Sequence, residues 1–216
     1  SSGSFSMRFL ANDMCFESAG STFVPNDPQD LVDAIAFANS KVSAYLLDFL
    51  TPGIGFREGA ISALPFIKNG SHDYAKRLIE ITKMDWAESE TSDDFETSPL
   101  LFMKSELLED NFNALKSRWH KITDEARNLE EEINHRQIES FGLQDELSPE
   151  LSMSEVTLNC NPAYRYGEQI SEEERQNRFL SNTISEFLSY AVGCMFGRYS
   201  LDAPGLILAN QGESLE

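Results

Sequence analysis

The feature that most constrains the fold is a long helical pattern in the middle of the chain. Apolar residues recur there at alternating intervals of four and three positions, at Leu108, Phe112, Leu115, Trp119, Ile122, Ala126, Leu129 and Ile133. An average spacing of about 3.5 residues is typical of a coiled-coil seam or of one arm of a long helical hairpin. We therefore predict a long helical arm over residues 104–141.

The neighbouring segments are also predicted to be helical. An amphipathic helix with Tyr74 and Leu78 on its apolar face is expected to end near Trp86. We interpret the acidic run from Asp85 to Asp94 as a solvated loop. The Ser-Glu-Glu-Glu sequence at 171–174 is a capping box, which opens another helix. The apolar face of that helix contains Phe179, Ile184, Phe187, Leu188, Ala191 and Val192.

The first third of the chain is predicted to combine strands with helices. Residues 5–24 largely alternate apolar and polar side chains around an Asn-Asp turn, as short strands do. Asp-Pro at 27–28 marks a helix start, and Ser40 opens a second helix. An extended stretch is expected to follow over residues 54–66.

The predicted fold class is therefore α+β and mostly α. A small strand-containing unit at residues 1–70 is followed by an acidic region of long antiparallel helices at 71–216, with a coiled-coil-like arm. The strands of residues 5–24 are too few for an independent sheet. We therefore expect the chain to be part of a longer protein.

Charge is distributed unevenly along the chain, which has 17 basic and 36 acidic residues and a net charge of −19. Residues 1–70 contain 4 basic and 7 acidic side chains, and residues 71–216 contain 13 and 29. Phosphate contacts need clustered Lys and Arg, so the chain is not expected to bind nucleic acid by itself. Any DNA contact is expected from residues 1–70.

Several kinds of site are not expected. The three cysteines, at positions 15, 160 and 194, and the three histidines lack metal-ligand spacing. Glycines 53, 55 and 59 lack the preceding strand and following helix of a dinucleotide-binding loop. No apolar run is long enough to span a membrane, and the odd number of scattered cysteines favours a reducing cytoplasm. The expected localisation is cytoplasmic.

Asn161-Pro162-Ala163-Tyr164 is similar to the motif with which DNA amino-methyltransferases hold a flipped adenine. That chemistry also needs a glycine-rich loop for S-adenosylmethionine, which this chain lacks, and the second proline of the motif is Ala163 here. We therefore predict no catalytic residue in this motif. A structural turn is predicted instead, in which Tyr164 and Tyr166, on either side of Arg165, pack the loop against the helix that begins after Ser171.

Longer motifs occur at residues 2–5, 46–56, 141–147, 161–167 and 189–201. They resemble the later part of the PglX-type adenine-specific DNA methyltransferases of BREX phage-defence systems. The resemblance spans most of the chain. It implies that the chain comprises the end of a target-recognition region and the helical part that follows.

The resemblance further implies a parent enzyme that methylates adenine N6 in DNA with S-adenosylmethionine and cooperates with other phage-defence proteins. The N-terminal methyltransferase domain of the family is missing here, so no catalytic, cofactor-binding or metal-binding residue is carried over. Residues 1–70 correspond to the part whose relatives lie against DNA. Arg8, Arg57 and Lys68 are therefore the candidate DNA contacts.

Two functions are open at this point. The first is a non-catalytic segment of such a methyltransferase, contributing to DNA target recognition and interdomain packing. The alternative is an independent helical module whose apolar seam recruits a partner protein. The predicted strands of residues 5–24 favour the first, because they require a larger sheet.

Overall fold

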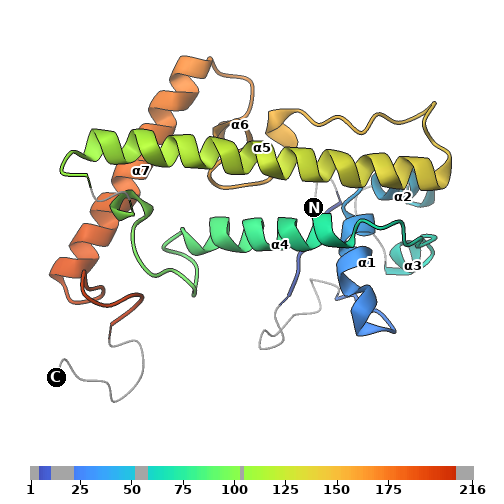
Figure 1. Cartoon of the computed structure of the whole chain (residues 1–216), viewed down its shortest axis with the longest axis horizontal. Coiled ribbons are helices and arrows are strands. Elements are labelled where there is room, and N and C mark those ends of the chain that lie inside the picture. Colours follow the sequence, from blue (N-terminus) through green and yellow to red (C-terminus); the bar gives the residue numbers. More distant parts are fainter. Residues whose placement is uncertain (1–4, 11–21, 52–57, 103–104, 208–216) are drawn as a thin grey trace. The chain divides into compact units, whose positions relative to one another are not determined.

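A computed structural model of the chain describes residues 5–10, 22–51, 58–102 and 105–207. Helices are the only regular secondary structure within these ranges (Figure 1). In chain order they are η1 (Pro28–Asp30), α1 (Leu31–Ala38), α2 (Lys41–Leu50), α3 (Glu58–Ser62), α4 (His72–Ala87), η2 (Pro99–Leu101), α5 (Leu108–Phe141), η3 (Met153–Glu155), α6 (Pro162–Tyr166) and α7 (Glu172–Met195).

The helices belong to two compact units, each built from two separate segments of the chain. Unit 1 consists of Ser1–Glu80 and Ala126–Leu151, and unit 2 consists of Ile81–Glu125 and Ser152–Glu216. Unit 1 therefore combines residues from both regions expected from the sequence, 1–70 and 71–216, whereas unit 2 lies within the second region alone. The assignment of residues 1–70 to target recognition stays a prediction.

The predicted α+β class is wrong for the described part of the chain. Residues 5–10 and 22–24 form no strand, and part of the expected extended stretch is the helix α3. Residues 11–21 and 52–57, on which the rest of these predictions falls, lie outside the described residues.

A side chain, and not a second strand, pairs with the backbone of the first segment. The Met7 N–H donates to Asn39 Oδ1 at 2.8 Å, and Asn39 Nδ2 donates to the Met7 carbonyl at 3.1 Å. Both backbone polar groups of Met7 are thereby satisfied. The alternation of apolar and polar residues did not require a sheet here, because a residue at the end of α1 provides the partner.

The predicted helix starts in the first third are confirmed. The Asp27 carboxylate accepts from the Gln29 N–H at 2.9 Å, and Pro28 occupies the first position of η1. Ser40 caps α2 in the same way, with its Oγ 3.3 Å from the Ser43 nitrogen. These caps satisfy backbone donors that a helix start leaves unpaired.

The core of unit 1 forms where α1, α2 and α4 pack against the second half of α5. Phe37, Val42 and Ile138 are buried together, and the ring of Phe37 stacks on Phe141 at 5.8 Å between centroids. A second cluster contains Ala36, Ala75 and Ile133. Residues from three helices thus pack against the second half of α5.

Polar side chains of α5 hold the segment that follows it. Asn134 is buried and accepts from the Lys41 N–H at 2.9 Å, while its Nδ2 donates to the Pro149 carbonyl at 3.4 Å. Glu131 accepts from the Leu151 N–H at 3.0 Å. The segment after α5 therefore returns along this helix within unit 1.

The long helix predicted over residues 104–141 is confirmed as α5, which begins at Leu108 (Figure 1). Most seam positions are buried within the two units, whereas Leu108 at the start is 44% exposed. In unit 1 the seam residue Ile133 meets α1 and α4, and in unit 2 Trp119 meets Phe179 of α7. The seam is thus covered by several elements within the units.

Two of the family-like motifs form the ends of helices. After α7, Gly197 has φ +74°, its N–H donates to the Cys194 carbonyl, and the Arg198 N–H donates to the Gly193 carbonyl at 2.8 Å. This is a Schellman motif, whose positive φ favours glycine. The same pattern ends α5 at Gly142, with φ +66°.

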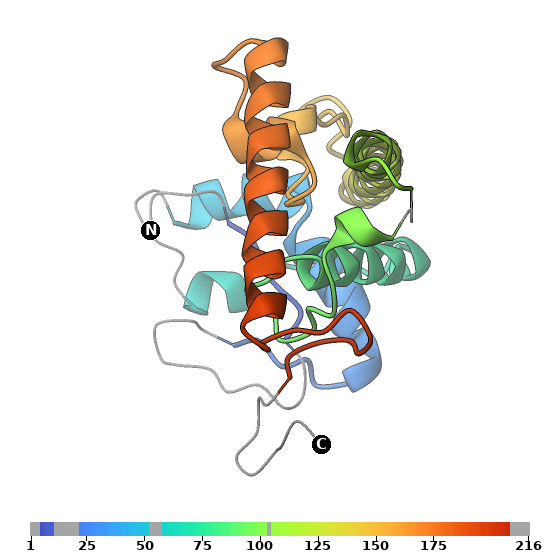
Figure 2. The same cartoon turned by 90° about the vertical axis from the view of Figure 1, so that its left-hand side faces the viewer.

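An aromatic cluster in unit 2 includes residues near the C-terminal end of α7, the orange-to-red helix in Figure 2. The rings of Tyr190 and Tyr199 stack at 5.2 Å, and Phe95 meets both rings edge-on. Tyr199 donates to Glu90 Oε1 at 3.2 Å. Burial raises the pKa of both tyrosines, which therefore stay protonated at neutral pH. The motif at 189–201 is thus a packing motif.

Gly193→Ala should destabilise the chain by about 1–3 kcal/mol through overpacking. A Cβ at this position would lie 2.6 Å from Cδ2 of Tyr199, whose ring is held by Phe95 and Tyr190. Denaturant unfolding followed by circular dichroism measures the effect. Gly59→Ala is the control, because a Cβ there meets nothing within 4 Å. Equal stability of the Gly193 variant and the unmodified chain would contradict this packing.

Candidate functional site

Two of the three candidate DNA contacts, Arg8 and Lys68, are among the described residues, and both lie in unit 1. Arg8 is exposed and lies outside any helix. Lys68 is also exposed and forms an ion pair with Asp30, and this hydrogen bond raises the pKa of Lys68. Arg57 lies outside the described residues. A phosphate would compete with Asp30 for Lys68, and the role of these residues as DNA contacts stays a prediction.

Asn161 has a structural role. Its side chain is 1% exposed, and its Nδ2 donates to the carbonyls of Met153 and Val156 at 2.7 and 2.8 Å. Its Oδ1 accepts from the Ala163 N–H at 3.0 Å, which caps α6. Both ends of the amide are thus used within the fold, as the predicted structural turn requires.

The predicted packing of Tyr164 is wrong, because this side chain is 42% exposed. Its neighbour Tyr166 is the packed ring, with its centroid 6.5 Å from that of Phe179 and its hydroxyl 2.8 Å from Asn182 Nδ2. Residues two positions apart in a helix point about 200° apart, so only one of the two tyrosines can face α7.

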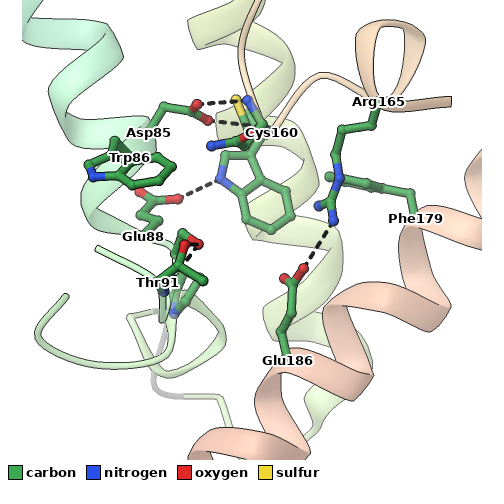
Figure 3. A pocket seen from close by; sticks show the side chains of 12 residues that line it. Asp85, Trp86, Glu88, Thr91, Cys160, Arg165, Phe179 and Glu186 are labelled. Carbon is green, nitrogen blue, oxygen red and sulfur yellow. Dashed lines mark hydrogen bonds and ion pairs between the residues drawn. The ribbon is translucent and has the colours of Figure 1, made fainter. Parts of the chain in front are cut away.

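Unit 2 contains a cavity of about 170 Å³ that the sequence did not predict (Figure 3). Trp86, Trp119 and Phe179 contribute aromatic surface to it. The charged part of the lining consists of the carboxylates of Asp85, Glu88 and Glu186 and the guanidinium group of Arg165. The only two tryptophans of the chain therefore line one cavity. We call this space the tryptophan cavity.

Two carboxylates near the end of α4 hold the walls of the tryptophan cavity together. Glu88 accepts from Trp119 Nε1 at 2.7 Å and forms an ion pair with Arg118, and its side chain is only 13% exposed. Asp85 accepts from the backbone N–H groups of Asn159 and Cys160 at 2.7 and 2.8 Å. These residues belong to the predicted solvated acidic stretch, but both are structural anchors.

The opposite wall contains a bound guanidinium group. Arg165 donates to Glu186 Oε1 at 3.0 Å, and its Cζ lies 5.9 Å from the ring centroid of Phe179 and 5.6 Å from that of Tyr166. Figure 3 shows Glu88 on one side of the cavity and Arg165 with Phe179 on the other. Aromatic rings and a carboxylate thus surround this cation.

Cys160 also lines the cavity. Burial raises the pKa of its thiol, and the nearby charge of Asp85 raises it further. The thiol therefore stays protonated at neutral pH and is a poor nucleophile. The cavity offers stacking surfaces and carboxylates, which suit non-covalent binding.

The described residues contain no group of three or more His, Cys, Asp or Glu side chains that could hold a metal ion. None of their helices is long and apolar enough to cross a membrane.

The tryptophan cavity had no recognisable signal in the sequence. Trp119 occupies a seam position, and the pattern correctly predicts that it is buried. Its partners Glu88 and Phe179 are 31 and 60 positions away, so no short motif joins them. Only the position of Trp86 among the acidic residues Asp85, Glu88 and Glu90 could have drawn attention to this region.

Comparison with known proteins supports the resemblance seen in the motifs. No protein-family model matches the chain. The adenine-specific methyltransferase BrxX of Escherichia coli O9:H4 (strain HS) is 35% identical to it over 211 residues, which is 96% of the chain. The adenine-specific methyltransferase PglX of Lacticaseibacillus casei (strain Zhang) is 35% identical over 220 aligned positions, covering 97% of the chain. The chain spans 17% of the length of each relative.

Proposed function

We propose, from the confirmed relationship of this chain to the PglX-type adenine-specific methyltransferases, that it is a non-catalytic segment of such an enzyme. The enzyme would methylate adenine N6 in DNA as part of a BREX phage-defence system. The segment would contribute to DNA target recognition and interdomain packing. The observation that carries this proposal is the 35% identity to BrxX over 96% of the chain.

The non-catalytic role is supported by the use of Asn161 as a helix cap. Its Oδ1 would have to accept from an adenine amino group in a methyltransferase pocket, but it accepts from a backbone N–H. S-adenosylmethionine and the methyl-transfer chemistry are therefore assigned to the rest of the parent enzyme. That cofactor would supply the methyl group there.

The packing role is supported by apolar side chains along α7. Leu188, Val192 and Met195 are 57%, 47% and 77% exposed, and their spacing of four and three residues places them on one side of the helix. The alternative function, recruitment of a partner through the α5 seam, is less well supported. Leu115 and Ile133 of that seam are already buried within their units.

A DNA-binding experiment on the whole methyltransferase tests the target-recognition role. Replacing Arg8 and Lys68 together by Ala should weaken binding to the target duplex and reduce the salt dependence of the affinity. Each lost phosphate contact should lower the magnitude of the log–log slope by about 1. Fluorescence anisotropy at several salt concentrations measures both quantities.

Arg178→Ala is the matched control, because Arg178 is exposed on α7 and pairs only with Glu174 in the described contacts. It should leave affinity and slope unchanged. If the double variant behaves like this control, the two residues do not contact DNA. If the chain by itself binds S-adenosylmethionine in a calorimetric titration, the non-catalytic assignment is wrong.

A further inference from the structure

We propose that the tryptophan cavity of unit 2 binds the guanidinium group of an arginine side chain from a basic segment of a partner protein. This inference goes beyond the proposed function and does not depend on it. It rests on the aromatic lining, on the charge of the lining, and on a guanidinium group that is already bound in the same wall.

The aromatic lining suits a flat cation. Trp86 is 50% exposed and is the ring that a ligand can reach, whereas Trp119 and Phe179 are 6% and 1% exposed and form the buried part of the lining. Aromatic faces attract cations, and a guanidinium group also stacks on them because it is planar and weakly hydrated. Arg therefore suits the Trp86 ring better than Lys.

The charge of the lining also favours a cation. Three carboxylates, from Asp85, Glu88 and Glu186, face one lining cation, Arg165. Arg118 balances Glu88, but Asp85 is held by backbone N–H groups and has no cationic partner in the described contacts. Unit 2 as a whole has 9 basic and 20 acidic residues, a net charge of −11. Its field attracts basic segments and repels phosphates.

Arg165 shows that these groups can hold a guanidinium. It lies over the Phe179 ring and donates to Oε1 of Glu186, while Oε2 of that carboxylate has no partner in the described contacts. Glu186 is 58% exposed, so Oε2 is available to a second donor. An incoming arginine would donate to Oε2 of Glu186 and stack beside Trp86.

The volume limits what can enter. A drug-sized ligand usually occupies a pocket of about 300–1,000 Å³, and the tryptophan cavity has about 170 Å³. This space accepts one side-chain head group but not a folded element. The occupant is therefore a single arginine projecting from a basic segment.

Intrinsic tryptophan fluorescence is a direct probe, because both tryptophans of the chain line the cavity. The full chain is titrated with a capped Gly-Gly-Arg-Gly-Gly peptide. Two matched peptides replace the arginine by lysine or by citrulline, which has nearly the same shape but no charge. A saturable fluorescence change is expected with the arginine peptide, about fivefold weaker binding with lysine, and no binding with citrulline.

Variants then locate the site. Glu186→Gln and Trp86→Ala change exposed side chains, and each should weaken binding of the arginine peptide about tenfold. Glu173→Gln removes the same charge from an exposed position of α7 outside the cavity and should leave the affinity unchanged. Thermal unfolding confirms that each variant is folded.

Three results would overturn the proposal. The first is a fluorescence change that does not saturate. The second is equal binding of the lysine and arginine peptides, which would show that net charge alone attracts them. The third is an equal effect of Glu173→Gln and Glu186→Gln, which would place the interaction outside the cavity.

Discussion

Leu115→Asp should lower the free energy of unfolding by about 4 kcal/mol or more. Leu115 is fully buried in α5, and the substitution both removes apolar contacts and takes a carboxylate out of water. Urea unfolding monitored by circular dichroism at 222 nm measures the loss. An incompletely folded variant, seen as lost helical signal without denaturant, agrees with the same expectation.

The control for this experiment must be chosen from the structure. Lys121→Ala changes an exposed side chain on the same helix and should alter stability by no more than about 0.5 kcal/mol. Glu131→Lys looks equally harmless from the seam pattern, but Glu131 accepts from the Leu151 N–H and is therefore unsuitable. Similar, small effects of Leu115→Asp and Lys121→Ala would contradict the burial of the seam.

Phe179→Ala should cost about 3–5 kcal/mol, as truncation of a buried aromatic side chain usually does. The Phe179 ring is 1% exposed and contacts the rings of Trp119 and Tyr166. Tyr164→Ala should cost less than about 1 kcal/mol, because its side chain is 42% exposed. Differential scanning calorimetry of the two variants measures the contrast.

The loss of the Phe179 ring should also be visible in the environment of Trp119. Near-ultraviolet circular dichroism is expected to lose tryptophan signal in Phe179→Ala and to keep it in Tyr164→Ala. If both variants unfold at the same temperature, the assignment of Tyr166 and not Tyr164 as the packed ring is wrong.

The sequence by itself determined where several of the longer helices begin. Asp27, Ser40 and Ser171 were identified as caps, and each accepts from a backbone N–H two or three residues later. The seam of α5 was read from its spacing alone. Such signals are local, because a cap and a helical period involve residues within one or two turns.

The family resemblance was also readable in the sequence, for a related reason. Its motifs include Gly142 and Gly197, which end helices with positive φ, and Asn161, which caps α6. These positions need a particular residue type, so they form recognisable patterns. They identify relatives, but they hold the backbone and do not show where DNA binds.

Tertiary structure decided what local patterns could not. Whether residues 5–10 form a strand depended on Asn39, more than thirty positions from Met7. The tryptophan cavity depends on contacts at comparable or longer range, from Glu88 to Trp119 and from Asp85 to Cys160. A side chain's partner is set by where the chain returns in space, which the spacing of nearby residues does not encode. The longer helices were therefore predictable from the sequence, whereas the lack of a strand at residues 5–10 and the tryptophan cavity were not.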